Sequence, residues 1–553
     1  MKILRLVILL LPFYCSAQTT KCFIQFTDKN NNPFSISNPS AFLSQRALDR
    51  RNLKHVPIEE NDLPVNPDYI DSVISKGAIL FTKSKWFNGI TVQADSATRV
   101  AIATLPFVQH VRSVNRLQSN IEDEKAIRNK FELPVKIDPN NLFRTQSYSY
   151  GQGYDQIHIM NGEYLHDIGF HGENMIIAIL DAGFYHANVL RPFDSLYANN
   201  QVLGTWDFVA NEPSVYEDYD HGMEVLSTIG SNIPGSFVGT APKASFWLLR
   251  TEDVATEHII EEYNWDAGAE FADSAGADII STSLGYTYFI NPTAGENHTY
   301  ADMNGHTTPC AISANTAFSK GMLVIASAGN SGSPGDPWHY IGTPADADSA
   351  LAVGAVDISG NYAPFSSAGP SSDGDVKPNV AAVGEGSTIA TTTGGVGGGN
   401  GTSFACPILA GSAACLWQAF PTKTNSEIFD AIQRSASQYQ TPDSMLGFGI
   451  PNFMLADQIL QENNVDLPDD YLAEIYPNPF VTNVTLSFYS TSNQDLSVKI
   501  FNAIGQNVFG KNFKAEENIY NYFLLPTQDL QKGIYFIEIF SEKNTYINKV
   551  VKL

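Results

Sequence analysis

The sequence predicts an α/β protein. We expect a doubly wound, mostly parallel sheet, with a small α+β unit before it and a β-sandwich after it. Three observations carry this prediction. Strand-length apolar runs alternate with helical patterns in the middle of the chain, the charge balance changes abruptly around that region, and the last 93 residues contain short strand-like runs. A chain of 553 residues has room for roughly two to four domains.

The overall composition is that of a folded protein. Hydrophobic residues make up 43% of the chain and charged residues 16%, which excludes a disordered chain. The net charge of −25 argues against nucleic acid and anionic membrane surfaces as partners. The five cysteines fit no zinc-binding pattern, and the sequence leaves open a disulfide among Cys310, Cys406 and Cys415.

The N-terminus has the pattern of a secretory signal peptide, which we assign to residues 1–17. Lys2 and Arg5 precede the apolar run Leu6–Tyr14, and Cys15–Ala17 offers a cleavage site of small residues. This run is too short to span a membrane, and no other stretch approaches 18 consecutive apolar residues. We therefore expect a soluble mature protein with no transmembrane anchor.

The region after the signal peptide reads as a small α+β unit followed by a linker, together residues 18–146. The segment from Gln118 to Tyr150 is polar, as linkers are. The expected strands are Cys22–Phe26, Ala78–Thr82, Gly89–Gln93 and Val108–Val114, and the expected helices are Asn38–Arg51, Asp68–Ser75 and Ser96–Leu105.

Charge separates this unit from the region that follows. Residues 19–146 hold 17 basic and 13 acidic side chains, a net of +4, whereas residues 147–460 hold 7 and 34, a net of −27. Opposite charge on adjacent units favours docking of the first on the second. Independent drift of the two surface charges would give the same contrast.

Residues 147–460 carry the pattern of the parallel sheet. In such sheets the active site lies beyond the carboxyl ends of the strands. Asp181 and Asn330 both stand just after a predicted strand. The expected buried strands are Ile176–Leu180, a strand containing Ile279 and Ile280, Leu323–Ala326 and Leu351–Val356, and a helix is expected at His258–Ala275.

A glycine-rich loop, Gly397–Gly401, runs directly into an apolar helical segment, Ile408–Trp417, with Ser403 at the junction. Unpaired N–H groups at a helix N-terminus can stabilise the oxyanion that forms when a serine attacks a carbonyl. A loop that merely caps a buried helix would show the same pattern. Serine also needs a base and an orienting acid, for which His221 and Asp181 are the candidates.

Four segments in order resemble the hallmark segments of the subtilisin-like serine proteases. They are Ile179–Gly183, His221–Gly222, Ser327–Asn330 and Gly401–Pro407, and the resemblance covers residues from about 148 to 460. The resemblance implies a serine endopeptidase with Ser403 as nucleophile, His221 as general base and Asp181 as its orienting acid. Asn330 would donate to the oxyanion. The chemistry requires no cofactor.

The same resemblance indicates the substrate-binding residues, which are Ser283, Leu284, Gly285, Ser327, Ala328, Gly329 and Gly342. Gly342 falls where the family has the floor of the S1 pocket. A glycine floor leaves room for a large side chain, so we expect a preference for large apolar P1 residues.

Both flanking regions resemble attachments of this family. The α+β unit resembles the inhibitory propeptide, which predicts a zymogen whose cover is removed by cleavage within 118–147. After a linker at 461–470, residues 471–553 resemble the C-terminal sorting domain of type IX secretion substrates. This implies a secreted or cell-surface protein, exported through the periplasm and outer membrane with the secretion machinery as partner. A carbohydrate-binding or spacer β-sandwich is the alternative.

Two further points stay open. The family commonly binds structural calcium, and the loops Asp302–Gly305 and Asp373–Asp375 offer oxygen ligands, although neither holds a full ligand set. A catalytically silent surface protein is the alternative function, and intact Asp181, His221, Asn330 and Ser403 argue against it. A metal-dependent hydrolase is poorly supported because the chain has no His-Glu-x-x-His motif.

Overall fold

The structure, a computed structural model, describes residues 19–114, Lys130, 148–289 and 297–461. The expected signal peptide, the polar connector between 118 and 147 except Lys130, and the connector at 462–470 lie outside the described residues. In the C-terminal region the structure describes 473–476, 478–480, 482–490, 493–515, 519–528, 530–541 and 545–553.

The N-terminal unit is a four-stranded antiparallel sheet with helices, as the sequence predicts. The expected helix at Asn38–Arg51 is wrong in its first half, because Ser44 caps a new helix there by accepting a hydrogen bond from Ala47 N. The elements are β1 (Thr20–Phe26), β2 (Ile79–Ser84), β3 (Gly89–Ala94), β4 (Val108–Ser113), η1 (Pro39–Ala41), α1 (Gln45–Lys54), η2 (Glu60–Asp62), α2 (Pro67–Ile74) and α3 (Ser96–Ala103).

The centre of the molecule is a seven-stranded sheet in the order β13-β12-β11-β10-β5-β9-β6, with every neighbouring pair parallel. The predicted doubly wound sheet is therefore confirmed. Its strands are β5 (Ile176–Asp181), β6 (Val202–Asp207), β9 (Ser245–Arg250), β10 (Ile279–Thr282), β11 (Leu323–Ser327), β12 (Ala350–Val356) and β13 (Val380–Val383).

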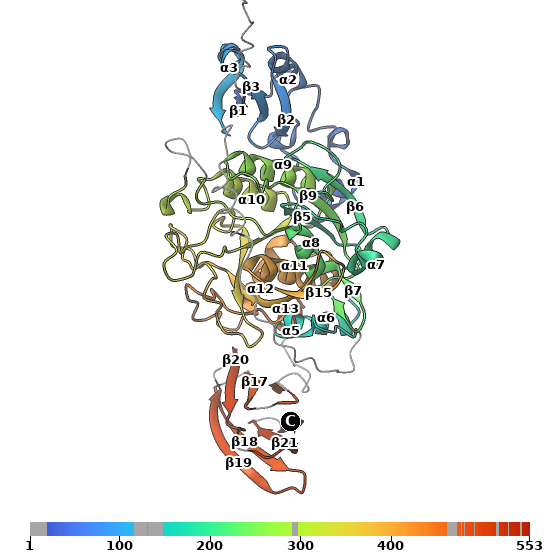
Figure 1. Cartoon of the computed structure of the whole chain (residues 1–553), viewed down its shortest axis with the longest axis vertical. Coiled ribbons are helices and arrows are strands. Elements are labelled where there is room, and N and C mark those ends of the chain that lie inside the picture. The colour runs from blue at the N-terminus through green and yellow to red at the C-terminus, as the bar shows by residue number, and fades with distance from the viewer. Residues whose placement is uncertain are drawn as a thin grey trace, which may run out of the picture.

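Helices cover both faces of this sheet (Figure 1). Ile177 and Ile179 of β5 pack in the core under α8 (His221–Gly230) and α11 (Thr402–Ala419). Ala178 and Leu180 point the other way, into the core under α9 (Ile260–Ala275) and α10 (Pro309–Ser319). Burial on both faces explains why these strands read as continuous apolar runs.

Shorter elements complete the central region. They are α5 (Tyr154–His158), α6 (Glu163–Asp167), η3 (Arg191–Phe193), α7 (Asp194–Ala198), β7 (Asn232–Ile233), β8 (Phe237–Val238), η4 (Tyr300–Asp302), β14 (Glu385–Ala390), β15 (Val396–Asn400), α12 (Asn425–Arg434) and α13 (Phe453–Leu460). Cys22, Cys310, Cys406 and Cys415 are buried free thiols, so the disulfide left open by the sequence does not form among these described cysteines.

The C-terminal region is a β-sandwich of two antiparallel sheets, β16-β17-β20 and β19-β18-β21-β22, as predicted. Alternate residues such as Leu486, Val498 and Ile537 face each other in a core of its own. The strands are β16 (Ala473–Tyr476), β17 (Val484–Ser490), β18 (Gln494–Asn502), β19 (Asn507–Ala515), β20 (Ile519–Leu525), β21 (Gly533–Phe540) and β22 (Thr545–Lys552).

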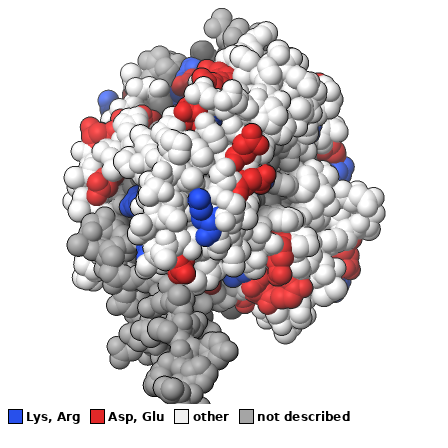
Figure 2. Space-filling model, turned by 90° about the horizontal axis from the view of Figure 1, so that it is seen from above, with Lys and Arg blue, Asp and Glu red and all other residues white. Residues whose placement is uncertain are grey.

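Acidic side chains form several separate groups on the face shown in Figure 2, with scattered basic side chains between them. Among the described helices, none is both long enough and apolar enough to cross a membrane.

Candidate active site

Asp181 and His221 form a buried hydrogen-bonded pair. Asp181 ends β5, and His221 is the first residue of α8. His221 Nδ1 donates to Asp181 Oδ1 at 2.7 Å, and the Ala182 N–H donates to the same oxygen at 2.7 Å. Gly222 makes this approach feasible, because a Cβ at that position would lie 2.4 Å from the Gly183 carbonyl oxygen and 2.9 Å from Asp181 Cβ.

Ser403 lies in the first turn of α11, which starts after Gly401 at φ +149°. Its hydroxyl donates to the Ser283 carbonyl at 3.4 Å, and the Ser283 hydroxyl donates to the Ser403 carbonyl at 2.7 Å. The ring of Phe404, the next residue, lies 6.0 Å from the His221 ring centroid to centroid. The structure thus brings His221 beside the N-terminus of α11.

The side chain of Asn330 is held in one orientation. It follows β11 and Gly329, whose φ of +107° is in the left-handed region. Its Oδ1 accepts hydrogen bonds from the backbone N–H and the hydroxyl of Thr402, both at 3.0 Å. With Oδ1 occupied in this way, the Nδ2 amide is left to face outward, where it donates to the Lys130 carbonyl at 3.4 Å.

Thr402 contacts the candidate site but was not among the residues expected from the sequence. Besides the two bonds to Asn330, its Oγ1 accepts a hydrogen bond from Gly329 N at 3.1 Å. Thr402 therefore links the start of α11, directly before Ser403, to the segment after β11 that carries Asn330. Its position directly before the candidate nucleophile was the only signal in the sequence.

The charge on Asp181 controls the protonation of His221. Burial by itself would lower the pKa of His221, but Asp181 foremost, together with the Glu224 and Asp220 carboxylates, more than offsets this and raises the pKa above its ordinary 6.5. The nearby Cys406 thiol faces the core and has a pKa raised to about 12 by burial, so it remains an unreactive thiol at neutral pH.

The predicted pocket residues come from neighbouring elements. Ser283, Leu284 and Gly285 follow β10, while Ser327 ends the adjacent β11 and Ala328 and Gly329 follow it. Gly342 packs against the two residues that follow Gly285. A Cβ at position 342 would lie 3.1 Å from Thr287 Cγ2 and 3.3 Å from the Tyr286 carbonyl oxygen. Leu284 is buried in the core on the α9 side, so its side chain is not available at the surface.

The N-terminal unit docks on α9 through buried charges. Asp273 of α9 pairs with Arg50 at 2.7 Å, Arg51 at 2.9 Å and Lys85 at 2.8 Å. Glu270, one turn earlier, accepts hydrogen bonds from the backbone N–H groups of residues 85 and 86 at 2.8 and 2.7 Å. These contacts agree with the docking that the charge contrast favours.

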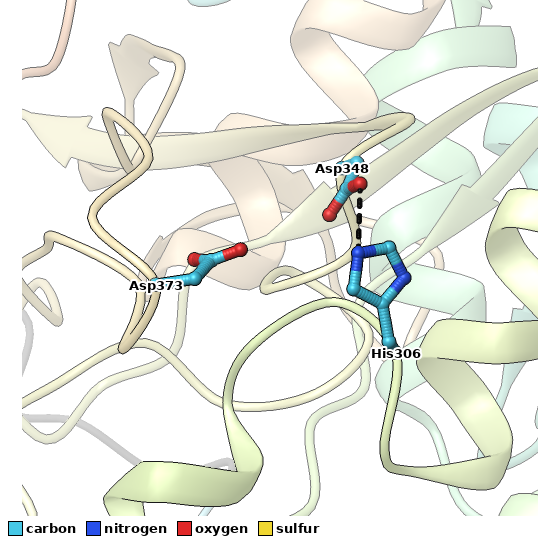
Figure 3. A group of neighbouring side chains, drawn as sticks. All are labelled: His306, Asp348 and Asp373. Atoms are coloured by element: carbon cyan, nitrogen blue, oxygen red, sulfur yellow. Dashed lines mark ion pairs between the residues drawn. The ribbon is translucent and has the colours of Figure 1, made fainter.

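The two candidate calcium loops contribute only one residue to the group of possible metal ligands that lies near them. His306, directly after the first loop, and Asp373 of the second lie near Asp348, and His306 Nε2 pairs with Asp348 at 3.2 Å (Figure 3). Asp302 instead accepts two hydrogen bonds from Thr299. One imidazole and two exposed carboxylates do not fit calcium, which takes six to eight oxygen ligands. Calcium binding therefore remains a prediction, and these two loops, as far as the structure describes them, do not supply its site.

Comparison with known proteins identifies the three regions. The profile of the subtilase family (Peptidase S8) matches residues 172–449, that of the Bacteroidota peptidase S8 propeptide domain residues 21–130, and that of a secretion system C-terminal sorting domain residues 474–553. Subtilisin E of Bacillus subtilis is 32% identical over 342 residues, 61% of this chain and 79% of the relative. Subtilisin of Bacillus pumilus is 33% identical over 298 residues, 53% and 94% of the two chains.

Proposed function

The chain belongs to the subtilase family of serine endopeptidases, and from this premise we propose that it cleaves proteins with the triad Asp181, His221 and Ser403. We also propose that it is made as an auto-inhibited zymogen. The sorting domain at its C-terminus directs export to the cell surface or the extracellular space. Proteins and peptides are the proposed substrates. We assign the propeptide with its linker to residues 18–146, the peptidase region to residues 147–460 and the sorting region to residues 471–553.

In the proposed mechanism Ser403 attacks the scissile carbonyl carbon while His221 Nε2 takes its proton. The acyl-enzyme forms as His221 returns this proton to the leaving amine, and water then hydrolyses the ester by the same route. Asp181 holds Nδ1–H and stabilises the imidazolium. The Asn330 amide and the Ser403 backbone N–H would donate to the oxyanion, and loss of such an amide costs about 3 kcal/mol in a subtilisin.

One observation supports this assignment above the others. The buried Asp181–His221 bond of 2.7 Å holds the imidazole, and the imidazole lies 6.0 Å, centroid to centroid, from the ring of Phe404 in the first turn of α11, the turn that also carries Ser403. The Ser403 hydroxyl itself donates to Ser283 at 3.4 Å, a long contact that a substrate would replace. Catalytic hydrogen bonds are commonly loose before substrate binds.

The zymogen proposal is supported by the docked N-terminal unit. Its basic side chains bury against Asp273, and the Lys130 carbonyl receives a hydrogen bond from Asn330, the proposed oxyanion donor. A propeptide seated in this way would keep substrates out until it is cut.

A serine-directed fluorophosphonate probe tests the proposal. We expect the activated chain to be labelled at Ser403 and to digest casein, and Ser403→Ala to abolish labelling and lower kcat by about 10⁶-fold, as in a subtilisin. Ser319→Ala, an exposed serine at the end of α10, is the matched control and should behave as the unmodified chain. Normal casein digestion by Ser403→Ala would refute the assignment.

A further inference from the structure

Three carboxylates are buried together near the predicted substrate-binding residues. Glu252 follows β9, Glu257 lies in the loop after it, and Glu261 is in the first turn of α9. Their exposed fractions are 0%, 7% and 0%, and one oxygen from each lies within 4.8 Å of the others. Burying like charges this closely is costly unless a cation joins them.

Lys130 provides such a cation. Its Nζ lies 2.9 Å from Glu252 Oε1 and 2.9 Å from Glu257 Oε1, and 4.9 Å from the centre of the Tyr286 ring. A lysine ammonium so placed combines two ion pairs with a cation–π contact. The three carboxylates, which we call the acidic pocket, thus already hold a basic side chain of the propeptide region.

The carboxylates outnumber the positive charge that Lys130 brings. Burial raises the pKa of Glu257 to about 7 against the opposing effect of Lys130, and burial with Glu252 and Glu257 raises that of Glu261 well above 4.5. Among the described residues, Glu261 Oε2 has no hydrogen-bond partner. This buried oxygen is an unused acceptor beside those that Lys130 occupies, and both lysine and arginine side chains supply several donors.

The pocket adjoins the substrate-binding residues. Tyr286 directly follows Gly285, and its backbone pairs with Thr343, next to Gly342. The backbone of Lys130 reaches the oxyanion donor, since its carbonyl accepts the Asn330 amide hydrogen bond at 3.4 Å. A residue that fills the acidic pocket therefore lies close to the reacting bond.

We propose that Glu252, Glu257 and Glu261 form a subsite for a lysine or arginine side chain of the substrate, on the acyl side of the scissile bond. Lys130 occupies this subsite until the propeptide leaves. This inference rests on the proposed peptidase function and adds a substrate class to it. The Lys130 carbonyl accepts the hydrogen bond of the proposed oxyanion donor Asn330, so Lys130 stands where the residue of the scissile carbonyl would lie, and this subsite is an alternative to the apolar P1 preference expected from Gly342.

A positional peptide library tests the subsite. Positions P1 to P4 are scanned with Lys, Arg, Gln and Leu on the activated enzyme, with rates normalised to fluorophosphonate-labelled Ser403. We expect Lys or Arg to exceed Gln in kcat/KM by at least tenfold at one position. Glu252→Gln and Glu257→Gln should each reduce that ratio toward one while labelling persists, because the buried partner of the ammonium has lost its charge.

Glu212→Gln, an exposed carboxylate before α8, is the matched control and should leave the ratio unchanged. Thermal unfolding of each variant checks that the fold is retained, and either glutamine variant suffices if the other does not fold. Equal rates for Lys and Gln at all four positions, or a basic preference that survives both substitutions, would overturn the inference. Loss of labelling in the unmodified chain would instead overturn the proposed function.

Discussion

At the scale of single residues, the protonation of His221 determines the pH range in which the proposed base works. The active form is neutral, and the Asp181 carboxylate raises the pKa of His221 in spite of its burial. We therefore expect kcat/KM to fall as the pH drops through a midpoint above 6.5. A pH–rate profile of the activated enzyme on a peptide without ionisable groups measures this midpoint.

Asp181→Asn provides the control for this profile. Without the Asp181 carboxylate, burial becomes the main influence on the pKa of His221, so the midpoint of the profile should move to lower pH. We expect kcat to drop by about 10⁴-fold at the same time. A profile that keeps its midpoint in the variant would show that another group is titrating.

At the scale of elements, α9 carries much of the docking site of the N-terminal unit, and the ion pairs that the docking helix α1 makes differ in burial. The Arg51 side chain is 1% exposed in its pairs with Asp62 and Asp273, whereas Arg46 is 39% exposed in its pair with Asp278. Breaking a buried pair leaves an uncompensated charge and costs about 3–5 kcal/mol. An exposed pair contributes about 0–1 kcal/mol.

We therefore expect Arg51→Ala to loosen the N-terminal unit and Arg46→Ala to have little effect. Thermal unfolding and limited proteolysis of the full chain, both in the Ser403→Ala background to prevent self-cleavage, measure the difference. Comparable destabilisation by the two variants would contradict the view that Asp273 anchors the interface.

Several strands buried on both sides were predictable from the sequence, because their apolar runs need no partner to be recognised. β5 and β11 are of this kind, and Asp181 and Asn330 follow from where those strands end. Three strands of the central sheet escaped prediction: β6 is only partly buried, β9 is partly exposed in its first half, and the buried β13 has an apolar run of only four residues. The Asn330 orientation and the acidic pocket depend on contacts between residues far apart in sequence, which local patterns do not encode.

At the scale of the whole molecule, the sorting region is built as a separate unit. Its described strands pair only with one another, and residues such as Val484 and Ile537 pack in their own core. The proposed catalytic residues Asp181, His221 and Ser403 belong to the central sheet and its helices. Folding of the peptidase should therefore not depend on the C-terminal sandwich, whereas export should.

We expect deletion of residues 474–553 to keep the protein inside the cell envelope and to leave its intrinsic activity within about twofold, because no residue of the proposed site is removed. Activity in the medium and in cell fractions, with fluorophosphonate labelling of the purified chain, measures both effects. The full-length Ser403→Ala chain is the matched control, since it should be exported and remain unlabelled. A truncated chain that is exported normally, or that is folded but unlabelled, would show that the tail acts on more than export.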